Sequence, residues 1–338
     1  EPIGPVLALS AFNHPVNLIV HQIGPAIAAG CPVLVKPSRD TPLSCHNVVS
    51  LLHEAGLPEA WCRMLLPASH DDIDRLVRDG RGRFLSFIGS AEVGWGLRSR
   101  LAPGMRCALE HGGIAPVLVD CGANLDHAAA AVAKGGFYHA GQVCVSVQQV
   151  FVHRDVIDGF LERIVAIAAA LKTGDPMLSD TDVGPLIKTS EADRVQAWIR
   201  EAKTLGASVM AGATRLSPSL MAPTVLRDAP PHAKVSSKEI FGPVISVQAY
   251  DDLGQACQRA NVGGFAFQAG IFTDSLNVAT RAYARLNASA VMVNDHSAFR
   301  VDWMPFAGLN QSGLGVGGIP QTYREMTVEK MMVLRGCP

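Results

Sequence analysis

The stretch "VLALSAFNHPVNLIVHQIGPAIAAGCPVLVKPS", residues 6–38, sets two short apolar runs on either side of a longer, helix-like segment. The runs 6–12 and 32–38 have the continuous apolar character of strands that are buried on both faces. The segment between them, 16–30, ends on Gly30, and a glycine commonly closes a helix at such a place. The order of strand, helix and strand predicts the first unit of a parallel sheet.

The same alternation continues along the first ninety residues. We expect further buried strands at 61–67 and 83–89, with helices at 43–56 and 71–80 between the strands. Strands that alternate with helices in this way are typical of parallel sheets covered on both faces. The sequence therefore predicts an α/β fold built on a doubly wound parallel sheet.

A second α/β unit is expected from residues 106–120 onward. Its predicted helices cover 125–141, 156–174, 191–207, 252–261 and 275–286, and its predicted strands include 270–274 and 289–295. A chain of 338 residues usually divides into two domains. Length and pattern thus agree on two units.

The composition excludes several classes of function. The formal net charge is −1 and charged residues make up 17% of the chain, so we expect no nucleic-acid partner. The eight cysteines lack the spacings of a zinc site, which predicts no metal and a reducing, cytoplasmic environment. No apolar run reaches the roughly 20 residues of a membrane-spanning helix, so no membrane partner is expected.

Both ends of the chain are unusual. The start, "EPIGPVL", has neither an initiator methionine nor a signal peptide, and we expect that an upstream segment is missing. At the other end, residues 327–336 alternate like a strand after a Gly-rich segment at 308–320. An isolated terminal strand needs a partner, so this tail predicts pairing with another subunit.

Cys144 lies in "GQVC", directly before a β-rich run. A thiol is a nucleophile only as the thiolate, which needs positive potential or a base nearby, whereas apolar surroundings act in the opposite direction. The local context fits both a catalytic nucleophile and a small apolar residue at the edge of a core.

Polar side chains follow three predicted strands, at the edge where doubly wound sheets bind ligands. Asn13 could donate to a developing oxyanion or cap a turn. Glu110 precedes two glycines that allow close backbone approach, so it could activate water or be a solvated strand-end residue. Lys36 could bind an anion or stay solvated. Gly89 and Ser90 open a predicted helix, whose N-terminus is suited to phosphate.

Seven motifs occur in order: "FNHP", "VKPS", "FIGSAEVG", "LEHGG", "GQVC", "KEIFGPV" and "PFAGLNQSGLG". With the 34 positions from Glu110 to Cys144, this order and spacing resembles the aldehyde dehydrogenase superfamily along essentially the whole chain. The resemblance implies an NAD(P)-binding domain at 1–112, a catalytic domain at 113–311, and a linker and oligomerisation tail at 312–338. It also implies a homo-oligomer, a dimer or tetramer, and a long front segment that this chain lacks.

The resemblance implies the oxidation of a small-molecule aldehyde to a carboxylic acid. Cys144 would attack the carbonyl to give a thiohemiacetal, while Asn13 and the backbone N–H of Cys144 hold the oxyanion. Hydride would pass to the nicotinamide, and Glu110 would activate the water that hydrolyses the thioester. These roles agree with what the residue types offer on their own.

For the cofactor, NAD or NADP, the resemblance places Lys36 and Ser38 near the adenosine ribose and Gly89 and Ser90 at the diphosphate. Arg39 stands where NAD-preferring members commonly carry a glutamate that binds the 2′-hydroxyl. Losing that carboxylate removes repulsion against a 2′-phosphate, which a guanidinium could bind. NADP use is therefore open, as is an Arg39 that faces solvent.

In the second half of the chain, the resemblance places Glu239 on the nicotinamide ribose with Phe241 beside it. Arg194 falls near a family lysine that reaches the same ribose, and Glu191 takes its partner position. His111 replaces the usual leucine of "LEHGG". It could perturb the neighbouring glutamate, or its side chain could face away.

The expected substrate pocket draws on residues near two of the motifs: His14, His296, Phe299, Arg300 and Phe306. Relatives that oxidise small anionic or hydroxylated aldehydes look similar here, so Arg300 or His14 could contact an anion. Arg300 could equally be a structural ion-pair partner, for example around Asp302.

A second class of function stays open at this point. Since the family's front segment is missing, the chain could be a non-catalytic relative that binds nucleotide or acts in assembly. Cofactor reduction by aldehydes discriminates between the two.

Overall fold

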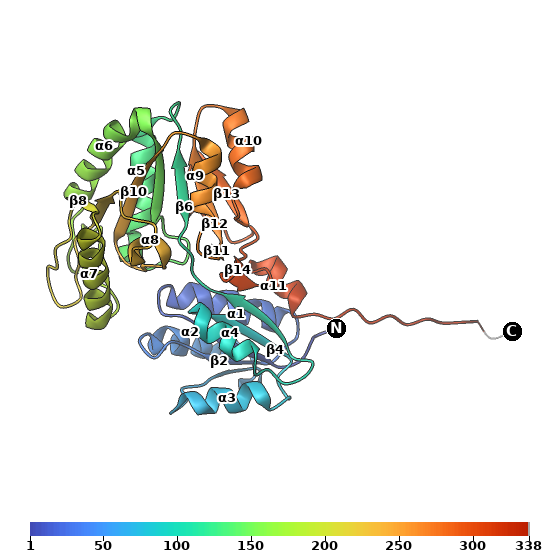
Figure 1. Cartoon of the computed structure of the whole chain (residues 1–338). Coiled ribbons are helices and arrows are strands. Elements are labelled where there is room, and N and C mark those ends of the chain that lie inside the picture. The colour runs from blue at the N-terminus through green and yellow to red at the C-terminus, as the bar shows by residue number, and fades with distance from the viewer. Residues whose placement is uncertain (337–338) are drawn as a thin grey trace. The chain divides into compact units, whose positions relative to one another are not determined.

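The computed structural model describes residues 1–336, apart from the side chain of His70, so Cys337 and Pro338 of the predicted tail lie outside the described residues. The chain forms two compact units. The first unit comprises residues 1–111, 301–307 and the chain from Gly313 onward. The second unit comprises 112–300 and 308–312 (Figure 1).

The first unit contains a six-stranded sheet in the order β15-β5-β4-β1-β2-β3. Its strands are β1 (Val6–Leu9), β2 (Val33–Lys36), β3 (Cys62–Met64), β4 (Phe84–Ile88), β5 (Arg106–Glu110) and β15 (Gly313–Leu314). Its helices are α1 (Pro15–Ala28), α2 (Pro42–Glu54), α3 (His70–Arg78), α4 (Ala91–Arg98) and α11 (Ile319–Glu325). All neighbours in the sheet are parallel except β15, which is antiparallel to β5.

Strand β1 shows why this sheet is covered on both faces. All four of its residues are buried, and successive side chains point to opposite faces of a strand. Val6 and Ala8 pack in a cluster with residues of α1 and α2, whereas Leu7 and Leu9 pack with residues of α3 and α4. The doubly wound parallel sheet predicted from the sequence is confirmed.

The second unit contains a seven-stranded sheet in the order β13-β12-β6-β7-β10-β9-β8. Its strands are β6 (Pro116–Val119), β7 (Gln149–His153), β8 (Ser208–Ala211), β9 (Thr224–Arg227), β10 (Val244–Tyr250), β12 (Gln268–Phe272) and β13 (Ala290–Val293). Its helices are α5 (Leu125–Phe137), α6 (Ile157–Ala170), α7 (Thr189–Thr204), α8 (Lys234–Ser237), α9 (Leu253–Ala260) and α10 (Leu276–Arg285). A separate pair joins β11 (Phe265–Ala266) to β14 (Leu309–Asn310).

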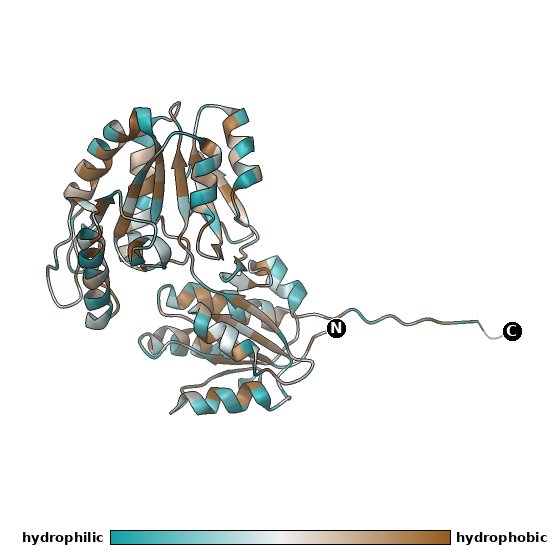
Figure 2. Ribbon diagram, in the orientation of Figure 1, coloured by the Kyte–Doolittle hydropathy of each residue, from teal (hydrophilic) through white to brown (hydrophobic). Residues whose placement is uncertain are grey.

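Helices cover both faces of this sheet as well. Val117 and Val119 of β6 belong to the large core with α5, α6 and α7, whereas Leu118 packs on the other face with α9 and α10. In Figure 2 the strands are largely hydrophobic and the helices carry one hydrophobic and one hydrophilic side. This two-sided burial explains the apolar runs in the sequence.

Several predicted elements end earlier than the sequence pattern indicates, and two of them lie next to candidate site residues. The first strand stops at Leu9, because Pro15 begins α1 and the residues between form a bend that carries Asn13. The helix predicted over 125–141 stops at Phe137, since His139 and Ala140 adopt left-handed backbone angles.

The tail differs more from its prediction. Thr327 forms an isolated antiparallel bridge with Pro2, and residues 328–336 form no strand in this chain. The side chains of Met331, Met332, Val333 and Leu334 are exposed. A strand needs the backbone of a neighbour, and within the described chain only Glu1 and Pro2 supply one.

The segment before the tail belongs to the first unit. β15 pairs with β5, α11 packs on α1, and Met326 is fully buried in the first unit's core. The sequence-based division placed residues 312–338 apart as a linker and tail, whereas the structure joins residues 313–326 to the first unit's core.

Several thiols are core residues of the first unit. Cys31, Cys45 and Cys62 are fully buried in one cluster with α1 and α2. Burial raises the pKa of Cys45 to about 12, with a further contribution from Cys62, and raises the pKa of Cys62 to about 11. These three thiols therefore behave as small apolar side chains.

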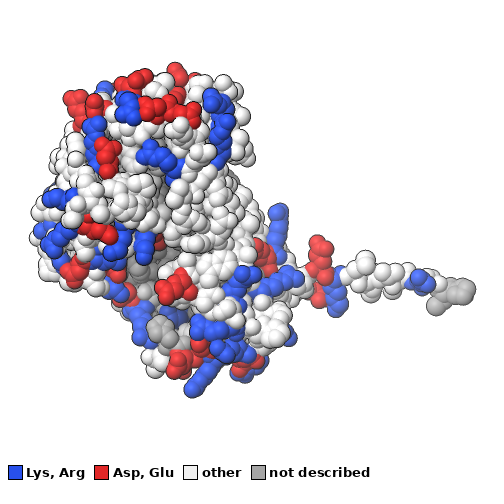
Figure 3. Space-filling model, viewed as in Figure 1, with Lys and Arg blue, Asp and Glu red and all other residues white. Residues whose placement is uncertain are grey.

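The surface has a mixed charge. On the face shown in Figure 3, Lys and Arg side chains are interspersed with Asp and Glu side chains, as the net charge of −1 leads one to expect. Within residues 1–336, no helix is long and apolar enough to cross a membrane.

Candidate active site

Cys144 lies in the loop between α5 and β7, and this loop has an unusual backbone. His139, Ala140 and Gly141 follow one another with φ of 50°, 54° and 70°. A Cβ atom at Gly141 would lie 2.1 Å from the carbonyl oxygen of Gly242, so only glycine fits there. Left-handed angles at non-glycine residues cost energy and persist only where the surroundings impose them. The loop is therefore held in one particular conformation just before Cys144.

Hydrogen bonds fix the loop on both sides of the thiol. The Gln142 amide donates to the His139 carbonyl at 3.0 Å and accepts from the Ile187 N–H at 2.8 Å. Ser297 donates to the carbonyl of Val145 at 2.9 Å. The half-buried Cys144 thus sits between anchored neighbours.

Tyr138 is a neighbour of the thiol that sequence reasoning missed. Burial raises the pKa of its phenol, and the charge of the Cys144 thiolate adds to this rise. The phenol therefore keeps its proton at any working pH. Its position at the end of α5, six residues before Cys144, gave no signal in the sequence.

Asn13 and Glu110 both lie at the carboxyl edge of the first unit's sheet. Asn13 is half-buried and follows β1, where α1 begins. Glu110 is half-buried and ends β5, and its carbonyl accepts the N–H of Gly89 at 3.0 Å. Only β4 separates β1 from β5, so the two strand ends are about 10 Å apart. The structure brings these two residues to one edge, as the sequence predicts.

The Gln22 side chain stabilises this edge of the sheet through hydrogen bonds to β1 and β4. Its side-chain amide donates to the carbonyls of Leu9 and Ser86 at 3.2 Å and 3.0 Å, and to the Ser86 hydroxyl at 3.0 Å. It therefore joins β4 to the last residue of β1, directly before the bend that carries Asn13. Sequence reasoning gave Gln22 no role.

Two cations lie at the end of β2. Lys36 is the last residue of the strand, and burial, followed by the charge of Arg39, lowers its pKa. Arg39 is exposed and donates to the carbonyls of Pro67 and Ala68 at 3.2 Å and 3.0 Å. The guanidinium is therefore attached to the loop after β3. Ser38 accepts the N–H of Asp40 at 3.3 Å and stabilises the turn.

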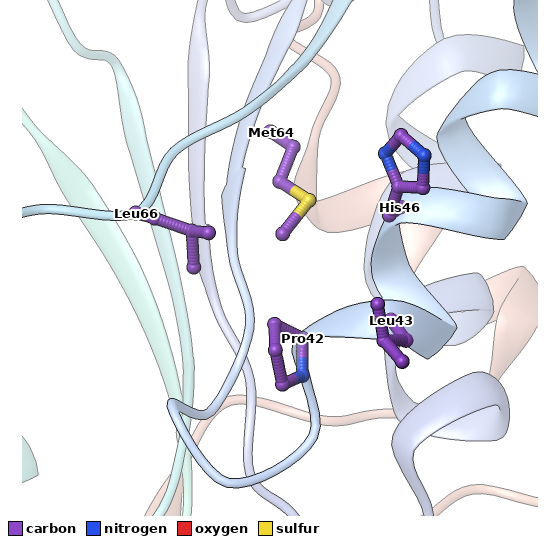
Figure 4. A pocket seen from close by; sticks show the side chains of 5 residues that line it. All are labelled: Pro42, Leu43, His46, Met64 and Leu66. Carbon is purple, nitrogen blue, oxygen red and sulfur yellow. The ribbon is translucent and has the colours of Figure 1, made fainter.

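A pocket of about 500 Å³ opens beside these cations, at the start of α2 and the end of β3. Pro42, Leu43, His46, Met64 and Leu66 line it (Figure 4). Leu43 and Leu66 are more than half exposed. Sequence reasoning missed this pocket, because the exposure of Leu43 and Leu66 becomes known only from the fold.

Gly89 and Ser90 precede α4 as predicted. A Cβ at Gly89 would lie 2.8 Å from the Phe87 ring, so this position needs glycine. Ser90 is the exposed N-cap of α4 and its side chain makes no capping hydrogen bond. The start of α4 therefore offers N–H groups and a partial positive charge to an anion.

In the second unit, the Glu239 carboxyl group is buried against the glycines of "LEHGG". Gly113 N–H donates to Oε1 at 3.2 Å, and a Cβ at Gly112 would overlap the carboxyl group at 1.5 Å. Burial raises the pKa of Glu239 to about 8, against the effects of the Gly113 hydrogen bond and the charge of Arg194. Phe241 nearby has φ of 46°, a strained angle for an aromatic residue.

The Arg194 side chain contacts the backbone of the segment that carries Glu239 and Phe241. Its Nη2 donates to the carbonyl of Ile240 at 2.8 Å, and its Nε donates to Glu191 at 2.8 Å. The guanidinium also stacks on Trp198 at 4.7 Å. The resemblance places Arg194 near a family lysine that reaches the ribose, and in the structure its donors contact Glu191 and the chain between Glu239 and Phe241.

The predicted substrate residues fall into two groups. His14 and the buried Phe306 belong to the first unit, where Phe306 exchanges backbone hydrogen bonds with Gly317. His296, Phe299 and Arg300 lie in one loop of the second unit. His296 is buried, and burial lowers its pKa.

Asp302, an expected neighbour of an Arg300 ion pair, instead contacts His21 at 3.1 Å.

Among residues 1–336, no cluster of His, Cys, Asp and Glu side chains could hold a metal ion.

Comparisons with known proteins agree on one family. The sequence profile of the aldehyde dehydrogenase family matches residues 1–332. The 3-sulfolactaldehyde dehydrogenase of Priestia aryabhattai is 36% identical over 334 residues, which cover 98% of this chain and 69% of that protein. NADP-dependent glyceraldehyde-3-phosphate dehydrogenase from Bacillus halodurans, solved with NADP, is similar with a TM-score of 0.94 at 33% identity, over 98% of this chain and 69% of that one.

A plant structure gives the same result. Aldehyde dehydrogenase 21 from Physcomitrella patens, solved with the product succinate, has a TM-score of 0.93 at 37% identity, over 96% of this chain and 67% of that one. Together with the match to the family profile, these similarities show that the chain belongs to the aldehyde dehydrogenase family.

Proposed function

We propose that this chain catalyses the NAD(P)-dependent oxidation of an aldehyde to a carboxylic acid, with Cys144 as the nucleophile. The observation that carries the proposal is the loop at 138–146, whose strained backbone and anchored neighbours present one half-buried thiol. Strain that a fold maintains around a nucleophile is typical of catalytic sites.

The Cys144 thiolate adds to the carbonyl carbon, and the carbonyl oxygen takes the negative charge. Asn13 and the Cys144 N–H donate to this oxygen. The chemistry that bound NAD(P) supplies is hydride acceptance, which leaves a thioester on Cys144. Glu110 then takes a proton from water as the water oxygen attacks the thioester carbon, and the carboxylic acid and the free thiolate result.

The residues at the edge of the first unit's sheet fit a dinucleotide. The apolar pocket beside His46 suits a flat adenine ring. The start of α4, at Gly89 and Ser90, suits the diphosphate. In the second unit, Glu239 is a hydrogen-bond acceptor for the nicotinamide ribose.

We favour NADP over NAD. Lys36 and Arg39 place two cations next to the pocket, and no glutamate occupies position 39 to repel a 2′-phosphate. The Bacillus halodurans relative is described as NADP-dependent. NAD is the competing cofactor in the test below.

We further propose a short anionic aldehyde as substrate. The similarity to a 3-sulfolactaldehyde dehydrogenase supports this class, and the cationic candidates for the anion contact are Arg300 and His14. We also propose that the exposed tail residues 331–334 pair with a second subunit in a homo-oligomer.

The deciding experiment measures reduced-cofactor absorbance with NAD and with NADP, across short, long and anionic aldehydes. We expect NADP reduction with a short anionic aldehyde, and no reduction by the Cys144→Ala variant, which keeps its affinity for cofactor. Silence from folded protein with every aldehyde would favour a non-catalytic relative that binds nucleotide. The solution mass decides the oligomeric state.

A further inference from the structure

His111 stands where the family commonly has leucine, and its side chain is enclosed, with 1% of its surface exposed. It follows Glu110 at the end of β5. Its Nδ1 lies 2.8 Å from the main-chain oxygen of Gly89. Because a carbonyl oxygen only accepts hydrogen bonds, Nδ1 carries the proton and donates it to this bond.

Both main-chain groups of Gly89 form hydrogen bonds, one with Glu110 and one with His111. Its N–H donates to the carbonyl of Glu110 at 3.0 Å, and its carbonyl accepts from His111. β4 and β5 end side by side, since Ile88 pairs with Glu110. The two hydrogen bonds therefore fasten the turn before α4 to the strand end that carries Glu110.

The imidazole ring fits tightly over the start of α4. A Cβ at Gly94 would lie 2.0 Å from Cε1 of His111 and 2.6 Å from its Nε2. The ring lies 5.7 Å from the Phe87 ring and 6.0 Å from the Trp95 ring, between centroids. The His111 ring therefore cannot turn aside unless α4 moves.

The same surroundings keep the ring neutral. His111 Nε2 is buried and has no hydrogen-bond partner among the described residues. Burial lowers the pKa of His111, against the effect of the Gly89 and Glu110 carbonyls. The charged side chains on the packed elements are Glu92 and Arg98 of α4 and Arg106 and Glu110 of β5, and β4 carries none.

We infer that His111 is a positioning residue that holds the Gly89 turn and the Glu110 strand end in a fixed relation. This inference rests on the proposed function, in which Gly89 meets the cofactor diphosphate and Glu110 activates water. Because the ring is enclosed, with 1% of its surface exposed, we assign it no direct contact with the cofactor or the reacting atoms. It acts on cofactor affinity through Gly89 and on thioester hydrolysis through Glu110.

Two variants separate the hydrogen bond from the volume of the ring. His111→Asn keeps a donor near the position of Nδ1, whereas His111→Leu keeps a side chain of similar bulk without a donor. We expect His111→Leu to raise the cofactor Kd about fivefold, as the loss of one hydrogen bond implies. His111→Asn should stay within about twofold of the parent, by the same reasoning.

His127→Leu is a matched control. It also removes a hydrogen bond from a histidine to a backbone carbonyl, that of Asn294 at 2.9 Å, but it does so in the second unit. We expect this control to leave the cofactor Kd unchanged. An equal rise in Kd in His127→Leu would show a general loss of stability and would overturn the inference.

A readout without activity tests the inference separately from the proposed function. In the cofactor-free full chain, ¹⁵N NMR should show the Nδ1–H tautomer of a neutral His111. Amide hydrogen exchange over residues 89–94 should be faster in His111→Leu than in the parent and the control. An Nε2–H tautomer, or unchanged exchange together with unchanged Kd, would overturn the inference.

The outcomes distinguish the two claims. Faster exchange in His111→Leu, with no aldehyde oxidised by the parent, would support the structural link and reject the dehydrogenase function. If His111→Leu does not fold, the tautomer in the parent decides instead, since that measurement needs only the intact ring.

Discussion

Arg194 donates a 2.8 Å hydrogen bond to the carbonyl of Ile240, the residue between Glu239 and Phe241. This hydrogen bond joins α7 to the segment that carries two proposed cofactor residues. Phe241 has a left-handed backbone, so this segment depends on its surroundings for its conformation. The role of Arg194 that follows from the geometry is to hold this turn.

Replacing Arg194 with Gln should therefore weaken cofactor binding without stopping the chemistry. We expect the KM for cofactor to rise about fivefold, the cost of one lost hydrogen bond, while kcat changes little. Steady-state kinetics with cofactor as the varied substrate measures both. Arg200→Gln, on the exposed side of the same helix, is the matched control. A fall in kcat alone would contradict the positioning role.

Glu239 should make cofactor binding depend on pH. With its pKa raised to about 8, it is largely protonated at neutral pH, and the carboxylate that accepts ribose hydroxyl bonds forms as the pH rises. We expect the Kd for cofactor to fall between pH 7 and pH 9. Titration calorimetry across this range measures the effect, and Glu239→Gln should flatten it.

The same shift has a consequence for stability. Between pH 4.5, the usual pKa of a glutamate side chain, and about pH 8, the unfolded chain loses this proton while the folded chain keeps it. The contribution of Glu239 to the free energy of unfolding therefore declines as the pH rises through that window. Glu239→Gln should reduce this decline in urea titrations, and an unchanged pH dependence would show that the carboxyl group is not buried in solution.

Glu110→Gln should separate acylation from deacylation. The amide cannot take a proton from water, so we expect the steady-state rate to fall about a hundredfold. A burst of reduced cofactor equal to the enzyme concentration should remain, and mass spectrometry should find the acyl group on Cys144. An unchanged steady-state rate would reject the role of Glu110.

Arg39→Glu should shift the cofactor preference towards NAD. The exchange removes a cation and places a carboxylate where a 2′-phosphate would lie, so we expect the KM for NADP to rise by about tenfold or more. The KM for NAD should change far less. Arg75→Glu makes the same charge change at an exposed position of α3 and serves as control. Equal effects on both cofactors would mean that Arg39 only stabilises the loop at 67–68.

The sequence predicts the order of strands and helices well because burial on both faces leaves a clear mark on it. β1 and β6 are apolar at every position, since each face of their sheets is covered by helices. The sequence also predicts that Asn13 and Glu110 lie at one edge of the sheet, because the carboxyl ends of parallel strands share an edge.

The rest depends on contacts between distant segments. The helix predicted to run to residue 141 stops at Phe137, because the chain must turn to meet Gly242, a hundred positions away. Arg39 donates to the backbone carbonyls of Pro67 and Ala68, and Arg194 donates to that of Ile240. Because every residue has a backbone carbonyl, the sequence does not indicate which of them is bound. Residue identity shows which groups are available, and only the fold shows which of them are already engaged.

Because Cys31, Cys45 and Cys62 are buried, thiol alkylation can be used to measure the fraction of active molecules in solution. Alkylating reagents react with accessible thiolates, so these three thiols are protected while the protein is folded. Cys121 is the exposed thiol among the described residues. In a background that lacks Cys107, Cys121 and Cys337, the stoichiometry of one alkylation reaction reports the fraction of molecules with a competent Cys144. Specific activity can then be expressed per working centre.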